Sequence, residues 1–319
     1  MNVAVIGGSG HIGSYLTPAL VEAGFDTICV SRSQRRPYVD HAAWSQVRHE
    51  TLDRAQPDFD QRIAEIGADA VIDLTCYTPE AAVSLVQALQ GNATRLLHCG
   101  TIWIHGVPTE VPVREEQSRN TFGDYGLRKA AIEEYLLGQT DVPVTILHPG
   151  HLVGEGWIPL NPAANFNPRV FADLASGRTV TLPNLGRETV HHVHAADVAQ
   201  CFVRALQHWP QAAGQSFHVV SPAALTLIGY AETVASWYGQ QARLEFRPWE
   251  EWRAGVTEKE ARTTWDHISR SPNCSIEKAR RLLGYEPRYS SLDAVREALF
   301  SPLFPHELTA GSQNPARPR

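Results

Sequence analysis

The chain has 319 residues, a length that fits one large domain or two fused domains. Hydrophobic residues make up 43% and charged residues 19%, a balance that supports a sizeable core and excludes collagen-like and fully disordered classes. The net charge of −6 argues against a general nucleic-acid-binding or acidic-membrane surface. Five scattered cysteines, no apolar run near the length of about 18 residues that spans a bilayer, and no export signal predict a cytoplasmic protein with reduced thiols.

Short β-rich runs alternate with amphipathic stretches through the first half of the chain. This alternation predicts an α/β fold with a doubly wound parallel sheet, because parallel neighbours need a crossover connection. The expected strands are Val3–Ile6, Thr27–Val30, Val47–Leu52, Ala70–Thr75, Arg95–Cys99 and Val144–His148, and the expected helices are Ile12–Ala23, Pro79–Leu89 and Tyr125–Leu137.

A glycine-rich loop joins the first expected strand to the first expected helix. It contains GxxGxxG through Gly7, Gly10 and Gly13, and GxGxxG through Gly8, Gly10 and Gly13. Glycines permit a tight turn and a close approach of a pyrophosphate, and the helix N-terminus adds free N–H groups. This placement predicts a dinucleotide site of the Rossmann type, and the alternative is a tight turn without a ligand. The expected contacts are Gly7, Gly8, Ser9, Gly10, His11, Ile12 and Gly13.

The end of the second strand bears on the choice between NAD and NADP. An NAD enzyme usually places a carboxylate there for the ribose 2′-hydroxyl, but this chain has Ser31 and Arg32. These side chains suit a 2′-phosphate, with Arg35 or Arg36 assisting, so NADP(H) is favoured and NAD(H) remains open. A solvated basic loop is the alternative. Asp53, after the third strand, is expected either to accept a hydrogen bond from the adenine amine or to cap a helix.

Tyr125 and Lys129 form the only YxxxK motif in a chain with three lysines. On a helix, positions i and i+4 share a face, so the ammonium would lie near the phenol and lower its pKa. Tyr125 would then act as general acid and base for hydride transfer at a secondary alcohol. Thr101 follows the strand Arg95–Cys99, where its hydroxyl can orient a substrate oxygen, although alone it would be an ordinary strand-end residue.

The composition of the chain changes after Pro159. The segment 161–168 is rich in turn-forming residues and cannot hold a regular helix. We expect residues 1–158 to form mainly the dinucleotide-binding domain and residues 159–307 to mix the last sheet elements with a smaller C-terminal substrate-binding subdomain. Residues 308–319 are expected to be a disordered tail. The later expected elements are Arg169–Ser176, Thr179–Leu182, Glu188–His194 and a helix over Ala196–His208.

Taken together, these motifs resemble those of the extended short-chain dehydrogenases/reductases, the NAD-dependent epimerase/dehydratase family. The resemblance runs from Met1 to about Phe300 and is specific as a set. Its other members are Asp73-Leu74-Thr75, Gly100-Thr101, Ile104-His105-Gly106, His148-Pro149-Gly150, the segment 194–199 and the segment 278–287.

The resemblance implies roles for particular residues. Thr101, Tyr125 and Lys129 would take the family's Ser/Thr, Tyr and Lys roles, and Lys129 would also bind the nicotinamide ribose. The helices Pro79–Leu89 and Tyr125–Leu137 match those through which relatives form homodimers. Further cofactor contacts are implied at Leu74, Thr75, His148 and Gly150.

Two departures from the family bear on the substrate. His148 stands where an arginine often precedes Pro-Gly, and Val190 stands where many nucleotide-sugar enzymes carry an arginine that grips the diphosphate. The spacing leaves open whether Arg187 or Arg270 substitutes. Several aromatic and histidine residues suggest a neutral, hydrogen-bonding substrate pocket, although each alone is more often a packing residue. The substrate candidates are Cys76, Tyr77, Trp103, His105, His151, Asn165 and His192.

No metal site is expected. His192 and His194 share one face of a strand beside His191, but no carboxylate or cysteine completes a ligand set near them at suitable spacing.

The first hypothesis for function is an NAD(P)-dependent oxidoreductase or epimerase acting on a secondary alcohol or ketone of a sugar-like substrate, nucleotide sugars included. A dehydratase is disfavoured because Ile102 and Trp103 follow Thr101 where dehydratases place a carboxylate. An NADPH-dependent reductase of a non-nucleotide metabolite is the close alternative. A non-catalytic RNA-binding or regulatory relative that keeps the cofactor site is the alternative of another class. The intact Thr/Tyr/Lys set and the negative charge argue against it.

Overall fold

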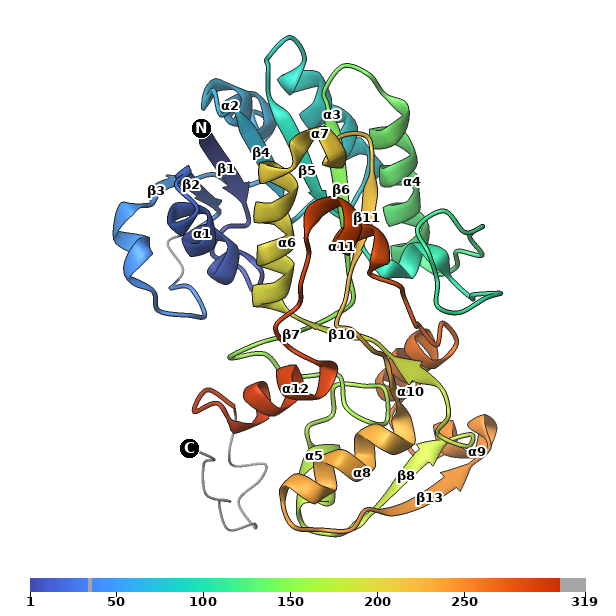
Figure 1. Cartoon of the computed structure of the whole chain (residues 1–319). Coiled ribbons are helices and arrows are strands. Elements are labelled where there is room, and N and C mark those ends of the chain that lie inside the picture. The colour runs from blue at the N-terminus through green and yellow to red at the C-terminus, as the bar shows by residue number, and fades with distance from the viewer. Residues whose placement is uncertain (34–35, 305–319) are drawn as a thin grey trace.

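A computed structural model describes residues 1–33 and 36–304, and a seven-stranded parallel sheet lies at its centre (Figure 1). The strand order is β11-β6-β5-β4-β1-β2-β3, which confirms the predicted doubly wound sheet. The order reverses between β1 and β4, and in such sheets ligands bind where the strands end beside this reversal. The strands are β1 (Asn2–Ile6), β2 (Asp26–Ser31), β3 (Arg48–Thr51), β4 (Ala70–Asp73), β5 (Arg95–Cys99), β6 (Val144–Pro149) and β11 (Ser216–Val219).

Helices cover both faces of the sheet, because successive strand residues point to opposite faces. Val3 and Val5 of β1 pack in one core with helices α1 and α6, while Ala4 and Ile6 pack in another core with α2, α3 and α4. Helix α3 begins at Pro79 after Thr78, whose hydroxyl accepts from the Ala81 amide. The helices are α1 (Gly13–Glu22), α2 (Phe59–Glu65), α3 (Pro79–Leu89), α4 (Asp124–Gly138) and α6 (Ala195–Gln207).

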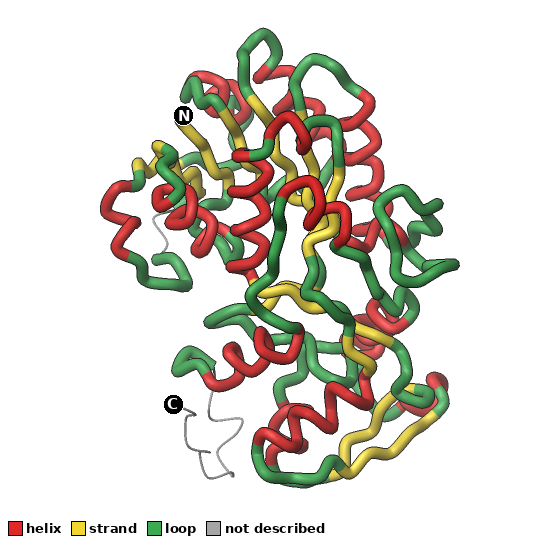
Figure 2. Tube along the Cα trace, in the orientation of Figure 1, coloured by secondary structure: helices red, strands yellow, loops and turns green. Residues whose placement is uncertain are grey.

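A second, smaller body with its own apolar core lies beyond the carboxyl ends of the strands (Figure 2). The parallel pair β8 (Thr179–Pro183) and β13 (Arg243–Arg247) forms one side of it. Its helices are α5 (Arg169–Ala175), α8 (Leu227–Trp237), α9 (Trp249–Ala254), α10 (Glu258–Ile268) and α12 (Ser291–Phe300). The remaining elements are η1 (Ala42–Gln46), η2 (Ile102–His105), β7 (His151–Val153), β9 (Thr189–Val190), β10 (His192–His194), α7 (Trp209–Ala212), β12 (Leu225–Thr226) and α11 (Glu277–Leu283).

The structure contains elements that the sequence-based prediction did not include, among them β7 and every element after α7. The last sheet strand, β11, escaped prediction because Ser216 and His218 interrupt its apolar pattern. The short helix α2 also escaped it, and the expected run Glu188–His194 is divided into β9 and β10. The predicted tail and Arg35 lie outside the described residues. No helix in the described part of the chain is long and apolar enough to cross a membrane, and all five cysteines are buried with free thiols.

Candidate functional site

The glycine loop follows β1, at the point where the order of the strands reverses. Its backbone is packed closely at the glycine positions. Gly7 follows β1 with a φ of +83°, a conformation that glycine adopts without strain. A Cβ on Gly13 would lie 2.5 Å from Gly7 O and from the carbonyl group of Gly8. The turn is therefore tightly folded at the start of α1. The amides of Gly7, Gly8 and Gly10 donate to carbonyl groups of the protein, so an anion in this cradle would meet the N-terminus of α1.

An aromatic group covers the glycine loop. The ring of His11 stacks on Trp157 with a centroid distance of 4.3 Å, and the edge of Tyr38 lies 5.6 Å away. Burial, with a smaller effect of His194, lowers the pKa of His11 to about 3, so its imidazole is neutral. Sequence reasoning placed His11 in the loop but missed its partner Trp157, which comes from a distant segment.

At the end of β2, only part of the predicted phosphate site can be described. The Ser31 hydroxyl donates to Ser33 O at 2.8 Å, and Arg32 is exposed. Arg36 forms an ion pair with Asp40. Asp53 accepts from the Ala55 amide at 3.0 Å in a local turn, and it does not cap the following helix, whose N-cap is Asp58.

Lys129 lies inside the molecule, where its ammonium joins the ends of two sheet strands. Its Nζ donates to Cys76 O at 2.8 Å and to Cys99 O at 2.7 Å. Only 3% of Lys129 is exposed, and burial lowers its pKa. The predicted substrate residue Cys76 therefore contributes its backbone to Lys129, and Tyr77 lies with its ring 5.1 Å from the same Nζ.

Tyr125 lies near Thr101. Thr101 ends the loop after β5 and caps η2, where its hydroxyl accepts from the Trp103 amide at 3.3 Å. Burial raises the pKa of Tyr125, with smaller contributions from Cys99 and Tyr77, and the Thr101 hydroxyl opposes this shift by lowering the pKa of the Tyr125 phenol. The expectation that Lys129 lowers this pKa is wrong for the described arrangement, because two carbonyl groups hold the ammonium.

Beside Tyr125, aromatic and imidazole rings form a continuous row. Trp103 lies edge-on to Tyr125 at 5.7 Å and to His267 at 5.1 Å. His151 lies 4.7 Å from His267 and 5.9 Å from His192. The structure thus brings together three of the predicted substrate residues. Sequence reasoning missed His267, which α10 supplies from a remote part of the chain with no motif around it.

Burial keeps this row of rings uncharged. It lowers the pKa of His267 to about 4 and that of His192 to about 3, and it lowers the pKa of His151 far below its ordinary value. Arg270 packs its guanidinium 4.0 Å from the ring of Trp103, and this group donates to Phe122 O at 2.7 Å.

The other candidates have structural partners. Asn165 is buried, accepts from Asn161 Nδ2 at 2.7 Å and donates to the Thr264 hydroxyl at 3.1 Å. Gly150 allows the chain to pass His191, since a Cβ there would lie 2.4 Å from His191 O. Thr75 and Leu74 lie against Gly7, the former with its Cγ2 2.6 Å from where a Gly7 Cβ would be.

The histidines considered for a metal bind backbone groups instead. His191 pairs with Ser221 O at 2.8 Å and His192 with Leu160 O at 3.1 Å, while His194 accepts from the Ala196 amide at 3.0 Å. Two other predicted residues, His105 and His148, lie in a separate buried cluster. His148 is buried there, and its Nε2 is hydrogen bonded to Glu133 at 2.7 Å.

Comparisons with known proteins agree with this architecture. The chain is 31% identical over 135 residues to 2'-dehydrokanamycin reductase of Streptomyces kanamyceticus, a match covering 42% of this chain and 37% of that protein. It is 22% identical to UDP-glucose 4-epimerase of Lacticaseibacillus casei, over 94% of this chain and 96% of that protein. Among solved structures, UDP-glucose 4-epimerase of Thermotoga maritima with UDP-glucose superposes with a TM-score of 0.71 at 16% identity, covering 94% and 97% of the two chains. UDP-glucuronic acid 4-epimerase of Bacillus cereus with NAD gives 0.68 at 16% identity, covering 93% and 97%.

These whole-length matches to solved structures establish the fold. The model of the NAD dependent epimerase/dehydratase family matches residues 3–219, more than half of the chain. The chain therefore belongs to the NAD dependent epimerase/dehydratase family.

Proposed function

We propose that this protein is an NAD(P)-dependent oxidoreductase or epimerase acting on a secondary alcohol or ketone of a sugar-like substrate. The observation that carries this proposal is the position of Tyr125, whose ring lies 5.7 Å from Trp103 just after Thr101, at the end of the sheet where β1 leads into the glycine loop. Lys129 supports the proposal by fixing the ends of β4 and β5 on either side of the site.

The residues of the loop fit a dinucleotide. A Cβ would collide with backbone at Gly13, so the loop is shaped for close approach of a pyrophosphate to main-chain amides. We assign Gly7 to Gly13 to the pyrophosphate and Lys129 to the nicotinamide ribose. Ser31 and Arg32 favour NADP(H) through a 2′-phosphate. A bound nicotinamide supplies or accepts the hydride at the substrate carbon.

The side chains of the site would handle the proton and the substrate oxygen. Tyr125 keeps its phenolic proton, because burial raises its pKa. In reduction, the phenol donates this proton to the carbonyl oxygen of a ketone and becomes a phenolate; in the reverse oxidation, the phenolate form receives the proton of an alcohol. Thr101 lies near Tyr125, and its hydroxyl would orient the same oxygen. The neutral row of Trp103, His151 and His267 would hold hydroxyl groups of the substrate.

A reductase of a non-nucleotide metabolite is the second candidate. The position that could hold a diphosphate-binding arginine is Val190, which is buried. Arg187 is exposed, and the guanidinium of Arg270 is occupied by the carbonyls of Phe122 and Asp266. A protonated Tyr125 suits ketone reduction, and one relative is named as a reductase of a modified aminoglycoside.

We also propose a homodimer formed through α3 and α4. Leu127 of α4 is 51% exposed, and Leu137 at the other end of the same helix is 36% exposed. Apolar side chains on this face would be covered by the same helices of a second copy.

Turnover with a defined panel tests the proposed function. Purified protein is incubated with NADP(H) or NAD(H) and nucleotide sugars, free ketosugars or non-sugar ketones, and products are identified by NMR while nicotinamide absorbance is followed. Net cofactor consumption with a ketone supports the reductase, and inversion of a sugar carbon without net consumption supports the epimerase. Cofactor binding without turnover of the panel or of a metabolite extract would contradict both and favour a non-catalytic relative.

A further inference from the structure

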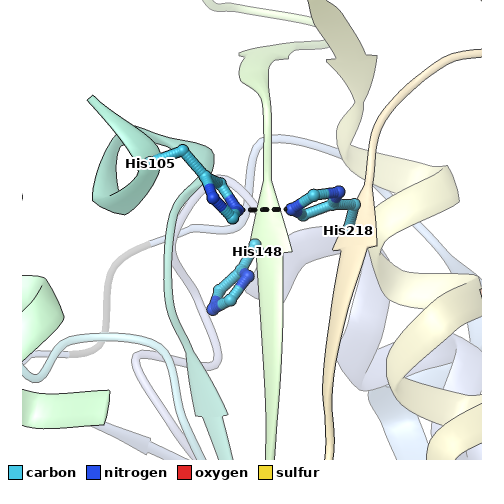
Figure 3. Close-up of side chains that lie close together, drawn as sticks. All are labelled: His105, His148 and His218. Atoms are coloured by element: carbon cyan, nitrogen blue, oxygen red, sulfur yellow. Dashed lines mark hydrogen bonds between the residues drawn. The ribbon is translucent and has the colours of Figure 1, made fainter. Parts of the chain in front are cut away.

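Three buried histidines from separate segments meet in one cluster (Figure 3). His105 ends η2, His148 lies on β6, and His218 lies opposite it on the neighbouring strand β11. The Nε2 atoms of His105 and His218 are 2.7 Å apart, and one nitrogen from each of the three rings lies within 4.8 Å of the other two. The proposed function uses none of these side chains.

Hydrogen bonds on the outer side of the cluster determine which nitrogens carry protons. His148 Nε2 lies 2.7 Å from Glu133 Oε2. The other oxygen of this carboxylate accepts a hydrogen bond from Arg119 at 2.6 Å. His218 Nδ1 lies 3.1 Å from Ser275 O. A paired carboxylate and a carbonyl oxygen only accept, so both ring nitrogens must be protonated. The opposite nitrogens, His148 Nδ1 and His218 Nε2, therefore carry free lone pairs.

His105 completes the cluster. Because His218 Nε2 carries no proton, His105 Nε2 must donate to it. The other nitrogen of His105, Nδ1, is then unprotonated and can only accept a hydrogen bond. Neither His105 Nδ1 nor His148 Nδ1 has a hydrogen-bond partner among the described residues, although both are buried. Buried acceptors without a donor are costly. Among the ring nitrogens that do not bond to Glu133 or Ser275, three thus carry a lone pair and one carries a proton.

Two acidic residues flank the cluster, one of them paired with Arg119. Glu133 lies on one side, and on the other Glu115 Oε1 accepts from the His218 amide at 2.8 Å and lies 3.9 Å from its Nδ1. Both carboxyl groups are buried, with 2% and 6% of the residues exposed. Buried carboxyl groups beside ring nitrogens with free lone pairs favour a cation.

We propose that His105, His148 and His218 bind one divalent transition-metal ion of the zinc type. Three neutral imidazoles suit zinc, copper, nickel or cobalt, and not magnesium or calcium. Ligand histidines characteristically donate their second N–H to a carboxylate or a backbone carbonyl, as His148 and His218 do here. On binding, the proton of His105 Nε2 moves to its Nδ1, so all three ligands remain neutral and no proton is released.

The movements required are small. Zinc–nitrogen bonds of about 2.0–2.1 Å in a tetrahedral site place the nitrogens about 3.3 Å apart. His105 and His218 would separate slightly from 2.7 Å, and His148 Nδ1 would approach them. The ion would join η2 to β6 and β11. Since Thr101 caps η2, the metal would hold this catalytic segment in place without touching substrate.

Metal binding by the full chain, made without a histidine tag and stripped with a chelator, tests the proposal. We expect one Zn²⁺ per chain by calorimetry, and a visible spectrum of low-coordinate Co²⁺. His105→Asn and His218→Asn should weaken binding at least about a hundredfold, and Glu133→Gln about ten- to a hundredfold. His191→Asn is the matched control, because His191 is equally buried but lies outside the cluster, and it should bind normally.

An anomalous-scattering map at the zinc edge, from a crystal of the wild type, keeps the test decisive if the variants fail to fold. A peak among His105, His148 and His218 supports the proposal. A metal-free wild type that binds no stoichiometric Zn²⁺, a peak located elsewhere, or unchanged binding in folded His105→Asn and His218→Asn would overturn it. None of these readouts depends on turnover, so failure here is distinct from failure of the proposed function.

Discussion

The glycine loop and the row of rings beside Tyr125 are built in opposite ways. The loop is one continuous segment, residues 7–13, whose function depends on backbone space, as the missing room at Gly13 shows. The row draws Trp103 from η2, His151 from β7, His192 from β10 and His267 from α10. A site made of contiguous backbone is recognisable in sequence, whereas a site assembled from distant side chains becomes visible only in the folded chain.

The two regions also differ in how they treat charge. The loop and the start of α1 offer amide dipoles to an anion. The row consists of imidazoles that burial keeps neutral, such as His192 with its pKa lowered to about 3. One end of the site is therefore suited to phosphate groups and the other to uncharged hydroxyl groups. The predictions below test this division, beginning with the residue that lies between the two regions.

Tyr125→Phe should remove turnover while leaving cofactor affinity almost unchanged, because only the acid/base group is lost. We expect a decrease in kcat of about 10²–10⁴-fold. Tyr135→Phe on the same helix is the control and should behave like the wild type. Retention of more than about a tenth of kcat in Tyr125→Phe would exclude the assigned role.

Lys129→Met should weaken cofactor binding and turnover together. The change removes the ammonium that bonds to Cys76 O and Cys99 O, so we also expect a lower free energy of unfolding. Lys259→Met, at an exposed position of α10, provides the control. Unchanged cofactor affinity in a folded Lys129→Met protein would show that the assigned ribose contact is wrong.

Arg32→Ala should reduce affinity for NADP without a matching loss for NAD. A single charge-assisted contact to the 2′-phosphate corresponds to a preference of about ten- to a hundredfold. Titration of both oxidised cofactors into wild type and variant measures it. Equal affinities in the wild type would indicate that Arg32 is only a solvated loop residue.

Gly13→Ala should disrupt the loop, because the new Cβ would meet three backbone atoms at 2.5 Å. We expect a loss of stability of about 1–3 kcal/mol and weaker cofactor binding. Gly138→Ala is matched to it, since a Cβ there meets nothing within 4 Å. Thermal unfolding and cofactor titration of both variants compare them. Similar behaviour of the two would contradict the close-packed cradle.

Asn165→Ala tests whether Asn165 has a structural role or a substrate-binding role. Its amide joins Asn161 to Thr264, so the variant should lose about 1–3 kcal/mol of unfolding free energy. The KM of the remaining folded enzyme should change little. A raised KM with unchanged stability would instead restore Asn165 as a substrate contact.

The features that could be predicted from the sequence are those set by one continuous segment, and the features that were missed depend on distant parts of the chain. Strand β5 and helix α3 match their predicted bounds, because a regular apolar pattern and Thr78-Pro79 define them locally. Strand β11 was missed since its pairing with β6 at one edge of the sheet, rather than its composition, makes it a strand. The partners of Lys129 were also hidden, because they are backbone carbonyls. His105 and His148 gave no sign of meeting His218, which lies on that missed strand.

The fate of deuterium at the reacting carbon tests the central claim most directly. With a ketone substrate and a cofactor deuterated at nicotinamide C4, we predict one deuterium at the product's alcohol carbon for each cofactor oxidised. With an epimerised sugar deuterated at the inverted carbon, we predict that the label returns to that carbon. Appearance of the deuterium in water would show a proton-abstraction mechanism and contradict hydride transfer at the site of Tyr125, Thr101 and Lys129.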